Sequence, residues 1–163
     1  MKTEYNNVQL KYFSWLANYQ LVFGVIGVIL LLINLGIATE IKNGMLFFLF
    51  KAILYAIPIY GGVQYHLGEY KSSMLYLKVG LILQIIGIYY HGFIYEFAVG
   101  LAAIADYMPD FNVISGRINI CKTNIYLGEG EGVIISLNVI ALILLMLLFK
   151  IESKFSNNIN NER

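Results

Sequence analysis

Four long apolar runs dominate the chain, and short polar segments separate them. The runs cover about residues 15–38, 44–63, 74–100 and 132–149. Each run approaches or exceeds the ~20 residues that a helix needs to cross ~30 Å of hydrocarbon. None shows the regular polar–apolar alternation that is typical of membrane-barrel strands. The pattern therefore predicts an all-α fold, a bundle of four transmembrane helices.

The sequence predicts one membrane domain followed by a short polar tail. Residues 1–154 are expected to form one integral membrane domain, and residues 155–163 a disordered cytoplasmic tail. A cleaved signal peptide is the alternative for the first run. A polar flank of about fourteen residues and the length of the run argue against it, so we expect the first run to remain as a signal anchor.

Lysine and arginine positions predict the orientation, because cytoplasmic loops carry an excess of them. One side of the predicted membrane carries Lys2, Lys11, Lys71, Lys78, Lys150, Lys154 and Arg163, and the other side carries Lys42, Arg117 and Lys122. This asymmetry places both termini in the cytoplasm of a bacterium, with the chain crossing the cytoplasmic (inner) membrane several times. Residues 65–71 then form a cytoplasmic turn.

The connection of about 30 residues between the third and fourth runs, 101–131, is predicted to lie outside the cytoplasm. Pro109 disfavours helix in the residue before it, so the third helix is expected to end near Asp106. The stretch "FNVISGRINI" alternates apolar and polar residues on both sides of Ser115 and Gly116, which indicates a small hairpin. An irregular loop that caps the bundle is the alternative.

Small and polar residues recur at helical spacing in the first and third runs. Such faces allow membrane helices to approach closely and to hydrogen-bond to one another. The predicted packing residues are Gln20, Gly24, Gly27, Gly80, Gln84 and Gly87. The second run has a similar face that includes Lys51 and Pro58.

Each run also contributes a polar group at a similar predicted depth below the outer surface. This polar intramembrane layer consists of Asn34, Lys51, His91, Glu96 and Asn138. A charge at such depth usually faces a partner or water. Three interpretations stay open: a hydrated cavity or binding site in which Lys51 pairs with Glu96, a dry structural ion pair, and snorkelling of Lys51 toward the headgroups.

Composition narrows the candidate chemistry. The chain has 59% hydrophobic and 13% charged residues, whereas soluble domains have about 25% charged residues. Its net charge of +1, without a basic patch, gives no indication of nucleic-acid binding. The single cysteine, Cys121, excludes disulfide exchange through cysteine pairs. It is expected to be a buried small residue, with an unpaired thiol or an intermolecular bridge as alternatives.

No catalytic motif, metal site or cofactor site is predicted. His66 and His91 are placed on different sides of the membrane, and neither has a full set of further ligands nearby. The sequence lacks a phosphate loop and a nucleophile elbow. These absences favour a non-enzymatic protein.

The predicted function is an oligomeric channel-like or membrane-sensor subunit that contacts membrane lipids and assembles with copies of itself. One alternative is an accessory or anchor subunit of a multi-protein system, for example in transport or antiphage defence. Such a subunit would dock a cytoplasmic partner through His66, Glu69 and Lys71. A second alternative is a membrane enzyme that modifies a lipid or isoprenoid.

Overall fold

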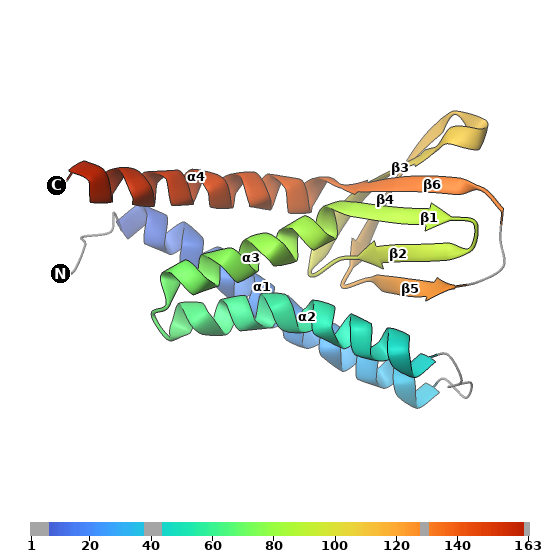
Figure 1. Ribbon diagram of the computed structural model, residues 1–163, viewed down its shortest axis with the longest axis horizontal. Helices are drawn as coiled ribbons and strands as arrows, with labels where there is room; N and C mark the ends of the chain where they lie inside the picture. The colour runs from blue at the N-terminus through green and yellow to red at the C-terminus, as the bar shows by residue number, and fades with distance from the viewer. Residues whose placement is uncertain (1–6, 38–43, 128–130, 162–163) are drawn as a thin grey trace.

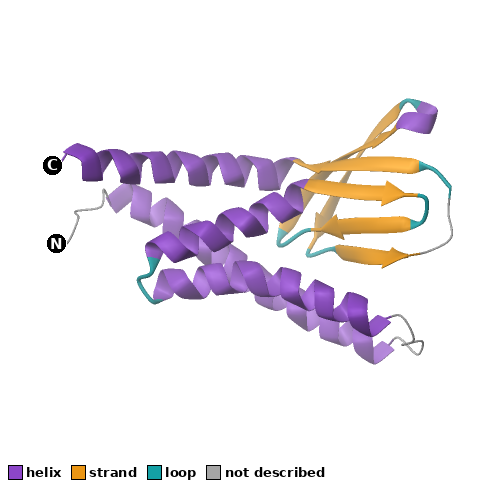
Figure 2. Cartoon of the chain, viewed as in Figure 1, coloured by secondary structure: helices purple, strands orange, loops and turns teal. Residues whose placement is uncertain are grey.

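The computed structural model describes residues 7–37, 44–127 and 131–161, which form four helices and a six-stranded antiparallel sheet (Figures 1 and 2). The predicted all-α four-helix bundle is therefore wrong. The elements in chain order are α1 (Asn7–Ile37), α2 (Gly44–His66), α3 (Tyr70–Ile85), β1 (Ile86–Tyr90), β2 (Phe93–Phe97), β3 (Leu101–Met108), the 3₁₀ turn η1 (Pro109–Phe111), β4 (Val113–Ile120), β5 (Thr123–Leu127), β6 (Val133–Asn138) and α4 (Val139–Asn161).

Two of the described helices are long and apolar enough to cross a membrane. They correspond to Leu10–Asn34 in α1 and Met45–His66 in α2. Helix α3 has 16 residues and is about 24 Å long, which is less than the ~30 Å of a hydrocarbon layer. The predicted helical spans 74–100 and 132–149 are wrong, because the first run contains β1 and β2 and the second contains β6.

The third apolar run changes from helix to strand at Ile86. The stretch "IGIYYHGFIYEF" is rich in β-branched and aromatic residues, which favour strands. Its turn residues, His91 and Gly92, have φ values of 44° and 87°. Positive φ at both central residues is the mark of a type I′ turn, whose twist matches that of the flanking strands. The run therefore folds back on itself as the β1–β2 hairpin.

The fourth apolar run is also divided, here between β6 and the first half of α4. Asn138 ends β6, and its Oδ1 accepts a hydrogen bond from the backbone N–H of Ala141 at 3.3 Å. This is the geometry of a helix N-cap, which satisfies a donor in the first turn. Helix α4 ends at Asn161, so it covers most of the segment 155–163 that was predicted to be a disordered tail.

The sheet has the strand order β4-β3-β6-β1-β2-β5 (Figure 2). The loop predicted for residues 101–131 thus contributes three strands. The β3–β4 hairpin turns at Pro109–Phe111 and Asn112, whose φ of 50° is left-handed. Ser115 and Gly116 lie inside β4, opposite Asp106 and Ala105, so the predicted turn position is wrong.

The sheet is strongly curled. Strands β4 and β5 lie at opposite edges, yet only Cys121 and Lys122 separate them in the chain. The three peptide steps from Ile120 to Thr123 can span at most about 11 Å. The two edges must therefore approach each other at this end, which we call the base of the sheet.

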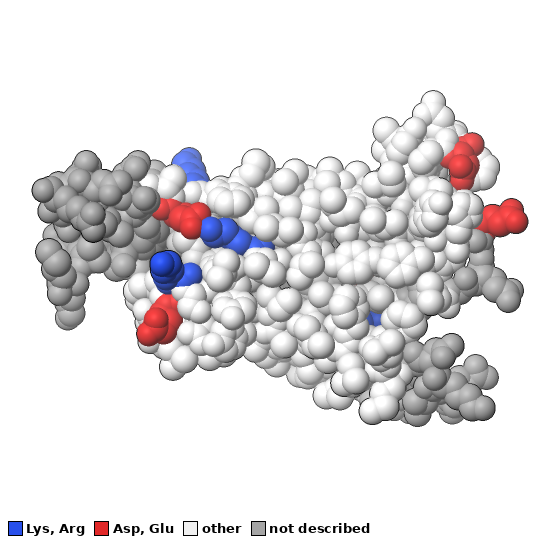
Figure 3. Space-filling view, in the orientation of Figure 1, with Lys and Arg blue, Asp and Glu red and all other residues white. Residues whose placement is uncertain are grey.

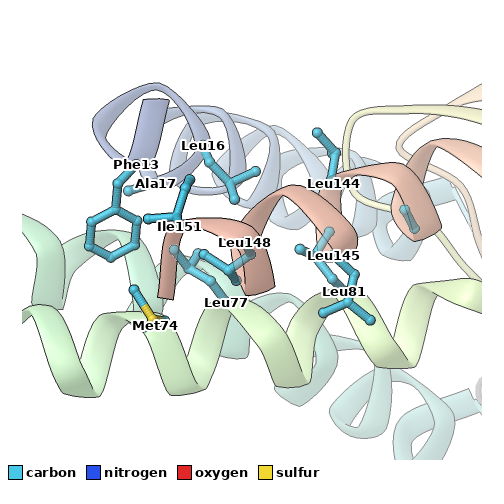
Figure 4. Close-up of a cluster of buried hydrophobic side chains, with 11 residues drawn as sticks. Phe13, Leu16, Ala17, Met74, Leu77, Leu81, Leu144, Leu145, Leu148 and Ile151 are labelled. Carbon is cyan, nitrogen blue, oxygen red and sulfur yellow. The ribbon is translucent and has the colours of Figure 1, made fainter. Parts of the chain in front are cut away.

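Two hydrophobic clusters hold the helices and the sheet together. The first lies between α1, α3 and α4, near the chain termini (Figure 4), and contains Phe13, Leu16, Ala17, Met74, Leu77, Leu81, Ala141, Leu144, Leu145, Leu148 and Ile151. The second packs α2 against the base of the sheet and contains Leu54, Tyr55, Phe97, Val99 and Ile125. The sheet is thus anchored to the helices as well as continuous with them.

Hydrogen bonds place the base of the sheet near the middle of both candidate spans. Tyr19 Oη accepts the backbone N–H of Leu101 at 2.8 Å, and the Cys121 thiol donates to the Phe23 carbonyl at 3.5 Å. On α2, the Thr123 hydroxyl donates to Tyr55 Oη. Because Phe23 and Tyr55 are the central residues of Leu10–Asn34 and Met45–His66, the sheet begins halfway along these helices.

Candidate functional site

The two faces of the sheet have opposite character. One row across neighbouring strands consists of Ile88, Ile135, Tyr107 and Ile114, which are paired in register and exposed. The next row contains Ser136, Asp106 and Ser115, which are also paired in register and point to the inside of the curl. In a soluble protein the enclosed face is normally the apolar one. Here the outer face is apolar, and the enclosed face carries polar side chains beside the buried Ala102 and Ile104.

A polar cluster occupies the inside of the curl. We define it as Glu96, Asp106, Arg117, Asn119, Lys122, Asn124 and Ser136. The side chains come from β2, β3, β4, β5, β6 and the β4–β5 connection. Local alternation explains their direction, because successive residues of a strand point to opposite faces.

Arg117 is the centre of the polar cluster. Its Nε and Nη2 donate to the two oxygens of Asp106 at 2.6 and 3.1 Å, and its Nη1 donates to Glu96 Oε1 at 2.8 Å. The two parallel bonds to Asp106 form the bidentate pair that a guanidinium makes with a carboxylate. Asp106 is on the adjacent strand, whereas Glu96 is on β2, four strands away in the sheet order. The bond to Glu96 therefore ties the β4 edge across the curl.

The remaining members complete the coordination of the two carboxylates. Glu96 also accepts hydrogen bonds from Asn119 at 3.3 Å and Asn124 at 3.4 Å, and pairs with Lys122 at 3.4 Å. Asp106 accepts a further bond from the Ser136 hydroxyl. Both carboxylate residues are buried, at 8% and 7% exposure. Two carboxylates face two cations, so the cluster has no net formal charge.

The cluster stabilises the ionised form of Asp106, which lies outside the candidate membrane spans. Burial raises the pKa of this carboxyl, but hydrogen bonds from Arg117 and Ser136, together with nearby positive charge, outweigh that effect. The net pKa of Asp106 is therefore below its usual value. The hydrogen bond to Asp106 in turn raises the pKa of the Arg117 guanidinium. Both directions favour the charged forms of the two side chains.

The predicted polar intramembrane layer is not assembled. Of its five members, only Glu96 belongs to the polar cluster. Asn138 is the buried cap of α4, and His91 is in the exposed β1–β2 turn, at the opposite end of the β1–β6 ladder. Asn34 is exposed on α1. Lys51 is half-buried on α2 and forms no ion pair with any described carboxylate, so the expected pairing with Glu96 is replaced by the pairs from Arg117 and Lys122.

The predicted packing residues lie at close contacts, most of them between helices. Gln84 Nε2 donates to Gln20 Oε1 at 3.3 Å, and Gln84 Oε1 accepts the Val99 N–H at 2.8 Å. A Cβ at Gly27 would lie 2.1 Å from the Tyr55 ring. Three further positions were predicted on helices: Gly24 faces Ile59 on α2, Gly80 faces Pro58 on α2, and Gly87 lies in strand β1 against Ser136.

The predicted docking residues all lie at the exposed α2–α3 turn. The His66 ring forms a hydrogen bond with Asn18 Oδ1 at 2.9 Å, which links the turn to α1. Glu69 and Lys71 are exposed. Their role toward a cytoplasmic partner stays a prediction.

Most of the polar cluster was not singled out from the sequence. The usable signals were the alternations "RINI" around Arg117 and Asn119 and "ISLN" around Ser136 and Asn138, since each places two polar residues on one strand face. The first alternation predicts a hairpin but not a buried ion pair, and the second lies within an apolar run whose length favours a helix. Among the described residues, no group of three or more His, Cys, Asp or Glu side chains is arranged to hold a metal ion.

The arrangement is suited to holding strands together rather than to bond chemistry. Each carboxylate of the polar cluster is already bound by a cation and by neutral donors, which leaves neither a poised base nor an activated nucleophile in it. No protein family model, curated protein or solved structure matches this chain.

Proposed function

We propose that the protein is a non-enzymatic integral membrane protein of the sensor type, in which the state of the curled sheet is transmitted to the helices α3 and α4. The observation that carries this proposal is the absence of a linker between sheet and helices. Helix α3 ends at Ile85 and β1 begins at Ile86, while β6 ends at Asn138 and α4 begins at Val139 (Figure 1).

The distribution of charge supports a membrane location. The exposed charged side chains lie at the two ends of the described structure. Lys11, Glu69, Lys71 and Lys150 are at the end of the helices near the termini, and Asp110 and Glu131 are at the far end of the sheet. Figure 3 shows a broad band between these ends that is almost entirely uncharged on the face in view, with a single small spot of positive charge. A surface of this kind matches a hydrocarbon layer with a polar region on each side.

The lengths of the elements support the same placement. Helix α3 and strand β1 have 16 and 5 residues, so together they extend about 40 Å at ~1.5 Å per helical and ~3.3 Å per strand residue. Neither element alone reaches across ~30 Å of hydrocarbon. With the base of the sheet near the middle of α1 and α2, the apolar outer face of the sheet continues the lipid-facing surface of the helices. The polar interior is then shielded from lipid.

The polar cluster provides the switch in this proposal. It ties edge strand β4 to β2 through Glu96 and to β3 and β6 through Asp106 and Ser136. Opening it changes the curl of the sheet around the central pair β1 and β6. Because these two strands continue directly as α3 and α4, a change in their angle moves the helices. An ion or charged ligand that competes for Arg117 or its carboxylates is the expected stimulus.

The experiment measures this coupling between the sheet and the helices. Spin labels on cysteines placed at Ser72 and Ser153, in a Cys121→Ala background, report the distance between α3 and α4 in lipid nanodiscs. We expect Arg117→Met, which opens the cluster, to shift the distance distribution, and Lys122→Met to leave it near that of the parent. An unchanged distribution in a folded Arg117→Met protein would contradict coupling. Release of the protein from membranes by alkaline carbonate would contradict the membrane location.

A further inference from the structure

Lys51 carries a charge inside one of the two candidate membrane spans. It lies on α2 about 9 Å from Met45, the first residue of the span, at ~1.5 Å per residue. The side chain is half-buried and forms no ion pair with any residue that the structure describes. An ionisable side chain at such depth normally faces a partner or a water-filled space. Lys51 therefore has a positive charge that the described part of the chain does not neutralise.

The Lys51 side chain lies close to the place where α2 contacts strand β5. Lys51 is one helical turn from Tyr55, so the two side chains project from the same side of α2. The Tyr55 hydroxyl accepts a hydrogen bond from Thr123 on β5, and Tyr55 shares a buried cluster with Ile125 of the same strand. Lys51 is therefore next to this contact, on the side toward Gly44.

The contact between α2 and the sheet opens toward the strand tips. Ile125 and Leu127 are two residues apart on β5, so they share the face that contacts α2. Ile125 is 2% exposed, whereas Leu127 is 70% exposed. The paired strand β2 repeats this change, because Phe97 is 2% and Phe93 is 39% exposed. A groove therefore begins at the base of the sheet and widens toward the tips, in the direction in which α2 and β5 diverge in Figure 1.

We call this the α2–β5 groove and define it by Phe47, Lys51, Phe93 and Leu127. Phe47 is half-buried and lies one turn beyond Lys51 on α2, so it extends the apolar side of the groove. Lys51 is the one charged side chain of the four. The next step rests on the proposed membrane location, in which the groove opens to lipid. A positive charge between apolar walls then suits a ligand that has an anionic group and an acyl chain.

We infer that the α2–β5 groove binds one anionic phospholipid of the bilayer. The Lys51 ammonium donates to the lipid phosphate, and an acyl chain packs along Phe47, Phe93 and Leu127. The methylene stem of a lysine allows its ammonium to extend toward the level of the headgroups, where it binds a phosphate as a point charge. Binding neutralises a charge that is costly to leave unpaired in a membrane. The lipid contacts both α2 and β5, so it extends the contact between the candidate span and the sheet.

Native mass spectrometry of the full-length protein tests this site. The protein is purified in detergent and mixed with equal amounts of phosphatidylglycerol and phosphatidylcholine, and the lipids that it retains are counted. The parent protein should retain one phosphatidylglycerol in preference to phosphatidylcholine. Lys51→Met should weaken this binding about tenfold or more, which is the effect of losing one charge-assisted hydrogen bond. Lys51→Arg keeps the charge and should retain the lipid.

Matched variants separate the groove from general charge attraction. Lys71→Met removes an exposed lysine at the α2–α3 turn and should leave the binding unchanged. Leu127→Asp places a carboxylate in the groove, where it competes with the phosphate, and should weaken the binding as Lys51→Met does. Ile114→Asp places the same charge on β4, at the other edge of the sheet, and should not weaken it. Far-UV circular dichroism checks that each variant is folded.

The outcomes separate this inference from the proposed function. Retention of phosphatidylglycerol by Lys51→Met at the parent level overturns the site, as does a loss in Lys71→Met or Ile114→Asp as large as that in Lys51→Met. Equal retention of phosphatidylcholine by the parent overturns the anionic ligand. Alkaline carbonate extraction is applied to membranes that contain the parent. A protein that resists extraction but retains no phosphatidylglycerol overturns only the lipid site, whereas an extracted one overturns the membrane location.

Discussion

Replacing Arg117 with methionine is the most direct test of the polar cluster. Methionine keeps a long unbranched chain but removes all three bonds to Asp106 and Glu96. The residues Asp106 and Glu96 are 7% and 8% exposed, and the ion pair that remains to them among the described residues is that of Lys122 with Glu96, at 3.4 Å. Removal of one partner of a buried ion pair typically costs about 3–5 kcal/mol, because the other charge is left without compensation.

The side chain of Arg117 is 33% exposed, so water screens part of this effect and the lower end of the range applies, about 3 kcal/mol. For a chain of 163 residues, each kcal/mol shifts the unfolding temperature by about 2–4 °C. We therefore expect the apparent Tm to fall by about 6–12 °C for Arg117→Met. The assay is thermal unfolding in detergent, followed by far-UV circular dichroism.

Lys122→Met is the matched control. Its side chain is 34% exposed and makes one contact of 3.4 Å with Glu96, so its loss should cost less than about 1 kcal/mol, or at most ~4 °C. Adding Glu96→Gln and Asp106→Asn to Arg117→Met removes the stranded charges and should recover a large part of the lost stability. The reasoning is refuted if Arg117→Met is no more destabilising than Lys122→Met.

Three further outcomes are expected in the same unfolding assay. Gly27→Ala should lower the Tm, because the new Cβ would lie 2.1 Å from the Tyr55 ring. Gly80→Ala is the control and should leave the Tm unchanged, because its Cβ would lie 3.6 Å from the nearest atom. Equal effects of the two changes would contradict the α1–α2 contact. Folding lowers the pKa of Asp106, so the stability that this carboxylate contributes should be constant above about pH 4 and lost as the pH falls below it. A loss of this stability that begins at neutral pH would contradict the lowered pKa. Lys51→Leu should leave Tm unchanged or raised, since it strands no described carboxylate; a large fall would reveal a partner.

The apolar character of the chain could be predicted from its sequence, but not the conformation of half of it. In α1 and α2, continuous hydropathy and helical geometry agree, and the predicted runs overlap the observed helices closely. In each of the other two runs, one part of the apolar stretch forms a helix and the other part forms strand. Ile86 and Leu137 face outward from a sheet, and a hydropathy window cannot distinguish this from a helix facing lipid.

Local signals for the sheet were present but weak. The pair His91–Gly92 between two stretches of isoleucine, tyrosine and phenylalanine is a hairpin signal, and Asn138 before a leucine-rich stretch is a helix-start signal. The polar cluster was harder to anticipate. Glu96 and Arg117 meet only because the sheet curls, and curl depends on pairing between segments far apart in the chain.

The direct continuation of α3 into β1 has a consequence for how the chain is made. Strand β1 pairs with β6, whose first residue follows the last residue of β1 by more than forty positions. Until β6 has been synthesised, β1 has only one of its two partner strands, β2, and the composition of the apolar stretch around Ile85 is that of a membrane helix. A helical state of this stretch therefore competes with the β1–β2 hairpin in the newly made chain. We expect the arrival of β6 to favour the strand, because it pairs with β1 along the whole of Ile86–Tyr90.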